Sequence, residues 1–159
     1  IFQYRDLETF VFALNQSVYR ITKGERYITF FVAEIDIKKK TLKYVNAGHY
    51  PPLLKMNGEL IRLNKGCTFI GAFEKLKNIK EEMIILKPEA MIVSFTDGLT
   101  DLKNQDEEFF SDTILEKFLD KNYKLDPEAF NTKLLGEINR FRGNMDITDD
   151  IAVLTCKIY

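Results

Sequence analysis

Two acidic positions far apart in the sequence have the residue type and the setting for metal chemistry. Asp97 follows the apolar run at residues 91–95, which predicts a buried strand that ends on a carboxylate. Asp149, followed at once by Asp150, stands just before the last apolar run of the chain, a second predicted strand. Carboxylate oxygens are the ligands that Mg²⁺ and Mn²⁺ prefer. If the two strands are antiparallel neighbours, the two aspartates meet at one edge of a sheet and could share an ion.

Gly98 directly follows the first of these carboxylates. Glycine lets the backbone adopt a positive φ or come close to a ligand, and we expect one of these two uses here. An ordinary strand-to-turn Asp-Gly pair, with its carboxylate solvated, is the alternative that the residues leave open.

The elements that must position these side chains can be read from periodicity and turn residues. We expect helices over residues 6–22, 111–120 and 126–143, and strands over residues 27–37, 42–47, 53–56, 60–63, 83–86, 91–96 and 151–158. Hairpin turns are expected at residues 38–40 and 57–58, and a loop at residues 65–80. Because hairpins link most of these strands, the pattern predicts an α+β fold in layers, with mostly antiparallel sheets, as a single domain over residues 1–159.

Composition excludes several classes of function. The chain has 159 residues, of which 45% are hydrophobic and 30% charged, and its net charge is −1. That balance suits a globular domain and gives no electrostatic support for a nucleic-acid partner. No apolar run reaches the roughly 20 residues that span a bilayer, so we expect no membrane segment in this chain. The two cysteines, Cys67 and Cys156, are too few for a disulfide scaffold and fit a reducing cytoplasm.

Three short motifs, taken in order, resemble those of one enzyme family. They are Asn-Ala-Gly-His-Tyr-Pro-Pro at residues 46–52, Thr-Asp-Gly-Leu-Thr-Asp at residues 96–101 and Asp-Asp-Ile-Ala at residues 149–152. Their order and spacing are similar to those of the SpoIIE/RsbU-type serine/threonine phosphatases, a bacterial branch of the metal-dependent PPM superfamily. The similarity covers essentially the whole chain, and three motifs in register are far more specific than any one of them.

The resemblance implies a fold and a metal site. The family fold is an α-β-β-α layered sandwich, and its site holds two Mn²⁺ or Mg²⁺ ions. Matched residue by residue, Asp97 and Asp149 correspond to metal ligands of the family. Gly98 and Asp150 would then lie beside the metals.

The first motif of the three carries a different implied role. Asn46, Gly48 and His49 correspond to a turn that shapes the surroundings of the site, and a structural role is expected for all three. His49 is the single histidine of the chain, which makes it the one other candidate for chemistry.

The chain departs from the family pattern at its beginning. Members of the family carry, upstream of the first helix here, an Asp-rich strand and a Gly-His-Gly-like segment that supply further metal ligands. Residues 1–159 contain no match to either segment, and the sequence begins at Ile1 without a methionine. We therefore expect a piece of a longer protein, without the N-terminal strand or strands and the first helix of the domain. Such a piece should bind metal weakly and turn over little, and its unpaired sheet edge could favour a homodimer.

By resemblance, the parent protein is expected to hydrolyse phosphoserine or phosphothreonine on a regulatory phosphoprotein, through a metal-activated water and without a phosphoenzyme. The implied substrate is a STAS-type anti-sigma-factor antagonist in cytoplasmic partner-switching signalling, with an upstream sensor domain in control. The alternative is a non-catalytic, phosphatase-like module that only binds a regulatory partner. A metal-dependent nuclease or phosphodiesterase is a third reading, for which the sequence offers no basic groove.

Overall fold

The computed structural model describes residues 5–159, so the start of the chain at Ile1 lies outside the described residues. Its elements separate into two compact units. The first unit comprises Ile1–Pro51 and Leu63–Leu86, and the second comprises Pro52–Arg62 and Lys87–Tyr159. Each unit is built on its own four-stranded sheet, and each is described by itself below.

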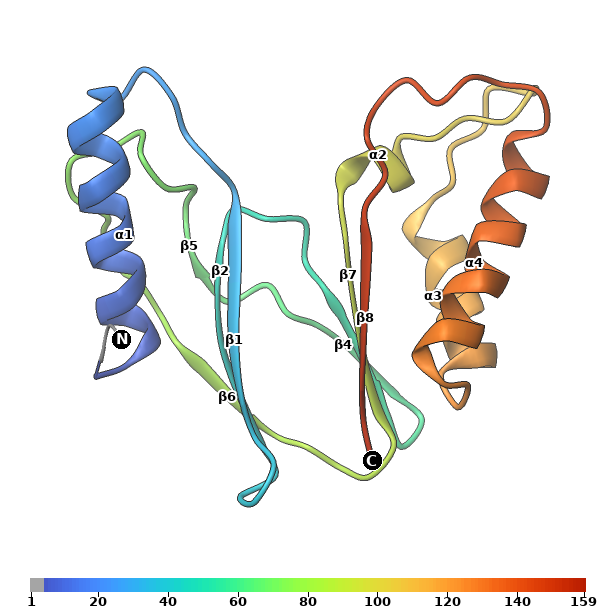
Figure 1. The fold of residues 1–159 in the computed structure, drawn as a ribbon, viewed down its shortest axis with the longest axis horizontal. Coiled ribbons are helices and arrows are strands. Elements are labelled where there is room, and N and C mark those ends of the chain that lie inside the picture. Colours follow the sequence, from blue (N-terminus) through green and yellow to red (C-terminus); the bar gives the residue numbers. More distant parts are fainter. Residues whose placement is uncertain (1–4) are drawn as a thin grey trace. The chain divides into compact units, whose positions relative to one another are not determined.

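The first unit packs one helix on a sheet (Figure 1). Its elements are α1 (Leu7–Thr22), β1 (Phe30–Asp36), β2 (Thr41–Ala47), β5 (Gly66–Cys67) and β6 (Glu82–Ile85). Strand β2 pairs antiparallel with β1 and β6 and parallel with β5. The apolar stripe of α1 faces this sheet, and Val11 of α1 is buried against Val45 and Ala47 of β2.

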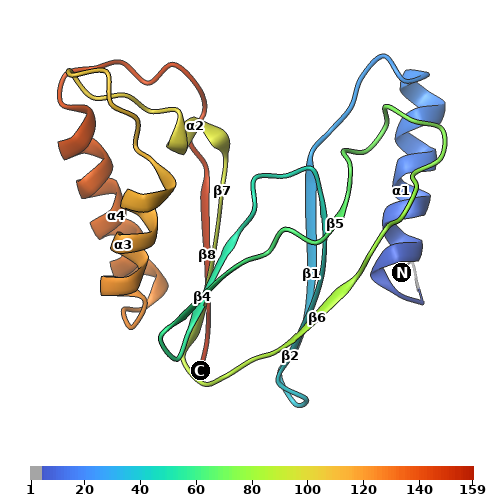
Figure 2. The ribbon, with the colours of Figure 1, turned by 180° about the vertical axis from the view of Figure 1, so that it is seen from behind.

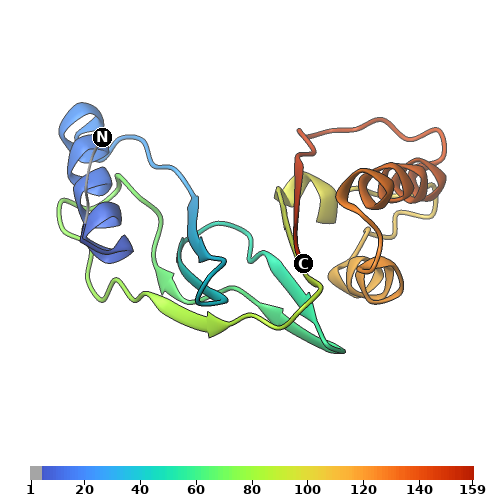
Figure 3. The same ribbon diagram turned by 60° about the horizontal axis from the view of Figure 1, so that its bottom comes forward.

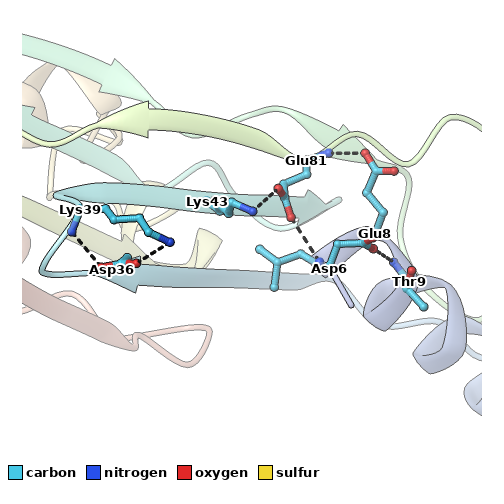
Figure 4. Close-up of polar contacts among 8 residues, drawn as sticks. Asp6, Glu8, Thr9, Asp36, Lys39, Lys43 and Glu81 are labelled. Carbon is cyan, nitrogen blue, oxygen red and sulfur yellow. Dashed lines mark hydrogen bonds and ion pairs between the residues drawn. The ribbon is translucent and has the colours of Figure 1, made fainter. Parts of the chain in front are cut away.

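Polar contacts tie the start of α1 to the segment before β6 (Figure 4). Glu81 accepts a hydrogen bond from the Leu7 backbone amide at 3.2 Å, and its own amide donates to the Glu8 carboxylate at 2.9 Å. Glu81 also forms an ion pair with Lys43 of β2, at 3.2 Å between Nζ and Oε1. The free amides of a first helical turn need acceptors, and the Glu81 carboxylate supplies one for Leu7. Through its ion pair with Lys43, the same carboxylate links the start of α1 to β2.

The N-cap of α1 supports a prediction about pH. Asp6 accepts a hydrogen bond from the Thr9 amide at 2.7 Å, and the hydrogen bonds from the side chain and backbone of Thr9 lower the pKa of Asp6 below its ordinary 3.8. A lowered pKa in the folded state stabilises the fold above pH 3.8, and this contribution is lost as pH falls through the folded-state pKa. Asp6→Ala should therefore lower the urea midpoint at pH 7, and the gap to wild type should shrink at pH 3. A gap that grows on acidification would contradict this.

The second unit packs two helices on one face of the other sheet (Figure 2). Its strands are β3 (Leu53–Met56), β4 (Glu59–Arg62), β7 (Ala90–Phe95) and β8 (Val153–Ile158), in the order β4-β3-β7-β8 and antiparallel throughout. The helices are α2 (Asp97–Thr100), α3 (Asp112–Asn122) and α4 (Pro127–Arg142). Helix α3 contacts β3 and α4 contacts β8. Strand β7 lies inside the sheet, and Met91, Val93 and Phe95 are buried, as predicted.

Most of the predicted elements are present, and the differences have local causes. The one-turn helix α2 and the two-residue strand β5 were not predicted, because neither is long enough to show a hydrophobic period. Strand β1 begins at Phe30 rather than at residue 27, and no residue in it is fully buried. Among the described residues, no helix is long and apolar enough to cross a membrane.

Candidate metal centre

Strands β7 and β8 lie side by side in the second unit (Figure 3). Their ladder runs from Ala90 opposite Ile158 to Phe95 opposite Val153. Asp97 follows the end of β7 by two residues, and Asp149 precedes the start of β8 by four. Because the two strands are antiparallel, both aspartates lie beyond the same end of the ladder.

Thr96 fastens the segment before β8 to the end of β7. Its hydroxyl donates to the Asp150 carbonyl at 2.8 Å and accepts from the Ala152 amide at 3.0 Å. Its backbone amide donates to the Ala152 carbonyl at 3.1 Å. Three hydrogen bonds from one residue therefore continue the β7–β8 pairing past the last ladder pair, and they fix the backbone on which Asp149 stands.

Gly98 permits a close approach of the two segments. A Cβ placed on Gly98 would lie 2.6 Å from the Asp150 carbonyl oxygen and 3.4 Å from the Asp149 carbonyl carbon. Of the two uses expected for Gly98, a positive φ does not occur, because Gly98 lies in the first turn of α2 and is not among the residues with positive φ. The close approach is to the chain's own backbone, so the missing side chain serves the packing of Asp149–Asp150 against α2.

The two carboxylates suit a hard cation in type and in exposure. Asp97 is the first residue of α2, where its carbonyl oxygen accepts from the Asp101 amide and the Thr100 hydroxyl, and its side chain is exposed. Asp149 is also exposed, and its Oδ1 accepts from the Asp150 amide at 2.7 Å. No basic side chain among residues 5–159 forms an ion pair with either. Two such oxygen donors fit Mn²⁺ or Mg²⁺, which keep several waters when bound.

The described residues offer no larger group of metal ligands than this pair. Within residues 5–159, no group of three or more His, Cys, Asp or Glu side chains is arranged to hold a metal ion. Asp150 is exposed, and its backbone rather than its side chain makes the contacts to Thr96 and Gly98. The candidate ligands in the described chain are thus Asp97 and Asp149, with Asp150 as their neighbour.

The Asn46 turn is held by its own contacts in the first unit. Asn46 is buried, donates from Nδ2 to the Leu63 carbonyl at 3.0 Å and accepts at Oδ1 from the His49 amide at 2.8 Å. Gly48 has a φ of +73°, and a Cβ there would lie 3.0 Å from the backbone nitrogen of Phe69. Asn46 and Gly48 therefore shape the chain after β2, which agrees with a structural role for both.

Sequence reasoning named Thr96 only as part of a motif and missed its role. Its signal is a hydroxyl residue at the end of a buried strand, directly before the candidate ligand. Such a residue can bond an adjacent segment through both its hydroxyl and its backbone amide, but the sequence does not show which segment lies beside it.

Comparison with known proteins shows which family the chain belongs to. The family model of Stage II sporulation protein E (SpoIIE) matches residues 3–159, nearly the whole sequence. The chain belongs to the SpoIIE family. Protein IcfG of Synechocystis is 29% identical over 132 residues, a stretch that makes up 80% of this chain and 20% of IcfG. The chain therefore spans about a fifth of the length of this relative.

Solved structures share the fold of this SpoIIE-family chain. The SiaA-PP2C domain of Pseudomonas aeruginosa superposes with a TM-score of 0.79 at 15% identity, over 90% of this chain and 57% of that one. The phosphatase domain of SpoIIE from Bacillus subtilis, presoaked with Mn, gives 0.67 at 19% identity, over 99% and 75%. The RsbU and RsbW domains of Rv1364c from Mycobacterium tuberculosis give 0.71 at 21% identity, over 96% and 41%. These likenesses confirm the predicted α+β class with antiparallel sheets, the fold of PP2C-type phosphatase domains.

Proposed function

We infer that this SpoIIE-family chain is part of a metal-dependent protein serine/threonine phosphatase, with Asp97 and Asp149 as ligands of Mn²⁺ or Mg²⁺. The observation that supports this most is the convergence of the two aspartates at one end of the β7–β8 ladder, across more than fifty residues of sequence. Chains that share only a fold need not share a site, whereas this pair falls on two motifs of the family.

Two residues would bind the cation at this site, and two others hold the backbone segments that carry them. Asp97 and Asp149 would hold the cation through exposed carboxylate oxygens. Thr96 and Gly98 hold the two backbone segments together, so the carboxylates need little reorganisation when an ion binds. When bound, a divalent ion in such a site neutralises phosphate charge and lowers the pKa of a water molecule.

The proposed substrate is a phosphorylated regulatory protein of the STAS type, in a cytoplasmic partner-switching pathway under an upstream sensor domain. This part of the proposal rests on the family resemblance, and the matched chain named for the RsbU and RsbW domains of Rv1364c is in keeping with it. The competing proposal is a non-catalytic module that binds the same kind of partner. The small donor set within residues 5–159 favours that alternative.

One assay on two substrates separates the proposals. The 159-residue chain is incubated with a phosphorylated STAS-domain protein, with and without Mn²⁺, and phosphate release and complex formation are both measured. We expect slow, Mn²⁺-dependent release from this chain, because two carboxylates hold a dinuclear site weakly. A phosphorylated tyrosine peptide is the control substrate.

The possible results of this assay favour or contradict different proposals. Binding of the STAS-domain protein without any Mn²⁺-dependent release would favour the non-catalytic module. Robust turnover by this chain alone would contradict the expectation that it carries an incomplete site. Release that does not depend on a divalent cation would refute the metal-dependent mechanism.

A further inference from the structure

A positively charged groove lies between α3 and α4 on the second unit. It has a volume of about 490 Å³. Lys117 and Lys121 line it from α3, and Lys133, Glu137 and Arg140 line it from α4. These helices carry none of the candidate metal ligands, so the groove is separate in the sequence from that site.

The charges of the groove are not balanced within the described chain. Glu137 is its one carboxylate, and it pairs with Arg140 at 2.8 Å. Lys133 donates to the Asn122 side-chain oxygen at 2.7 Å, a neutral acceptor that leaves the positive charge in place. Lys117 and Lys121 form no ion pair with any carboxylate of residues 5–159. The groove thus has an excess of three positive charges on a chain whose net charge is −1.

Helix stability accounts for only part of this arrangement. Lys121 and Arg140 lie in the last turns of their helices, where a cation interacts favourably with the helix dipole. Lys133 lies four residues before Glu137 on α4, a spacing at which opposite charges attract. Lys117 lies in the interior of α3, four residues before Lys121, a spacing at which like charges repel. The pairing of Lys117 with Lys121 therefore adds nothing to the stability of α3.

The dimensions of the groove limit what can fill it. The lining residues run from Ile114 to Asn122 on α3 and from Lys133 to Arg140 on α4, nine and eight positions. At 1.5 Å per residue this is about 10–12 Å of helix, the length of roughly three to four residues of extended chain. Ile114 and Phe118 add apolar surface to the lining, and Phe118 is largely buried.

We propose that this groove binds a short, extended acidic segment of a protein partner. The carboxylates of the segment would pair with Lys117, Lys121 and Lys133, and an apolar side chain between them would lie on Ile114. A nucleic acid fits less well, because the groove offers no exposed aromatic ring for a base to stack on and the chain as a whole is slightly acidic. Pairing of this kind sets the choice of partner and the rate of association more than the final affinity.

The test uses a fluorescein-labelled peptide with the central sequence Glu-Leu-Glu-Glu, and fluorescence anisotropy on the 159-residue chain. Lys117→Glu/Lys121→Glu should weaken binding roughly tenfold, since two attractive contacts become repulsive. Binding of the wild type should also weaken with rising salt. The matched control is Lys38→Glu/Lys77→Glu, which changes the net charge equally at two exposed lysines of the first unit, and we expect less than a twofold effect from it.

A neutral double variant, a folding check and a control peptide complete the experiment. Lys117→Gln/Lys121→Gln removes the charges without adding repulsion, and circular dichroism shows whether each variant is folded. A peptide with glutamine in place of glutamate should not bind. The proposal is overturned if the wild type does not bind the acidic peptide, or if Lys38→Glu/Lys77→Glu weakens binding as much as Lys117→Glu/Lys121→Glu does. It is also overturned if oligothymidine or phosphatidylglycerol vesicles bind the groove in preference to the peptide.

Discussion

Replacing Gly98 with alanine is expected to lower the free energy of unfolding by about 3 kcal/mol, because a side chain forced into a filled space must displace its neighbours. The added Cβ would lie 2.6 Å from the Asp150 carbonyl oxygen and 3.1 Å from the Asp150 carbonyl carbon. Both neighbours are backbone atoms, which cannot rotate away as a flexible side chain can. The segment at residues 149–152 must move as a whole or α2 must shift.

Urea denaturation measures this effect, and amide hydrogen exchange locates it. Exchange should become faster at the Ala152 and Thr96 amides, whose partners lie across the strained contact. Gly136→Ala is the matched control, because nothing lies within 4 Å of a Cβ there and Gly136 is inside α4, where alanine is the better helix former. That variant should be as stable as wild type or more so. Equal stability of the two variants would show that Gly98 is not a close-contact position.

Asp97→Asn is expected to weaken Mn²⁺ binding at least tenfold and to remove any Mn²⁺-dependent phosphate release. The change exchanges a charged carboxylate for a neutral amide of the same shape, so the fold should be preserved. Substituting groups that merely orient a ligand costs roughly 10- to 100-fold in metal affinity, and loss of a ligand itself should cost no less. The electron paramagnetic resonance signal of free Mn²⁺ gives the affinity even when binding is weak.

Asp106→Asn is the control for this prediction. Asp106 is exposed, lies in the acidic connection between α2 and α3, and carries the same charge. Its replacement should leave the Mn²⁺ affinity within twofold of wild type. If Asp97→Asn and Asp106→Asn behave alike, the bound Mn²⁺ is attracted by general negative charge, and the assignment of Asp97 fails. Asp149→Asn should behave as Asp97→Asn does if the two residues share one ion.

The metal proposal and the groove proposal concern different residues of the second unit, so the two can be tested independently. The metal proposal depends on Asp97 and Asp149, at the end of the β7–β8 ladder. The groove proposal depends on the lysines of α3 and α4. A chain that binds the acidic peptide but not Mn²⁺ would fit the non-catalytic module, and one that binds Mn²⁺ but not the peptide would have to recognise its partner elsewhere.

Local sequence patterns determined the three long helices, the hairpins and the two candidate ligands. Asp126 followed by Pro127 marked the start of α4, and Gly143 marked its end, because a cap, a fixed φ and a terminal glycine with positive φ act over a few positions. The turn at Asn57 and Gly58 marked the β3–β4 hairpin for the same reason. Asp97 and Asp149 were recognisable because each stands at the boundary of an apolar run.

Only the tertiary structure decided which distant segments of the chain pack against one another. The β7–β8 pairing joins segments more than fifty residues apart, and no short-range pattern specifies such a partner, because it is selected by the burial of whole faces when the chain closes. The role of Thr96 and the contact of Gly98 with Asp150 follow only from that pairing. Lys133 likewise comes to face Lys117 and Lys121 only when α3 and α4 pack side by side on the sheet.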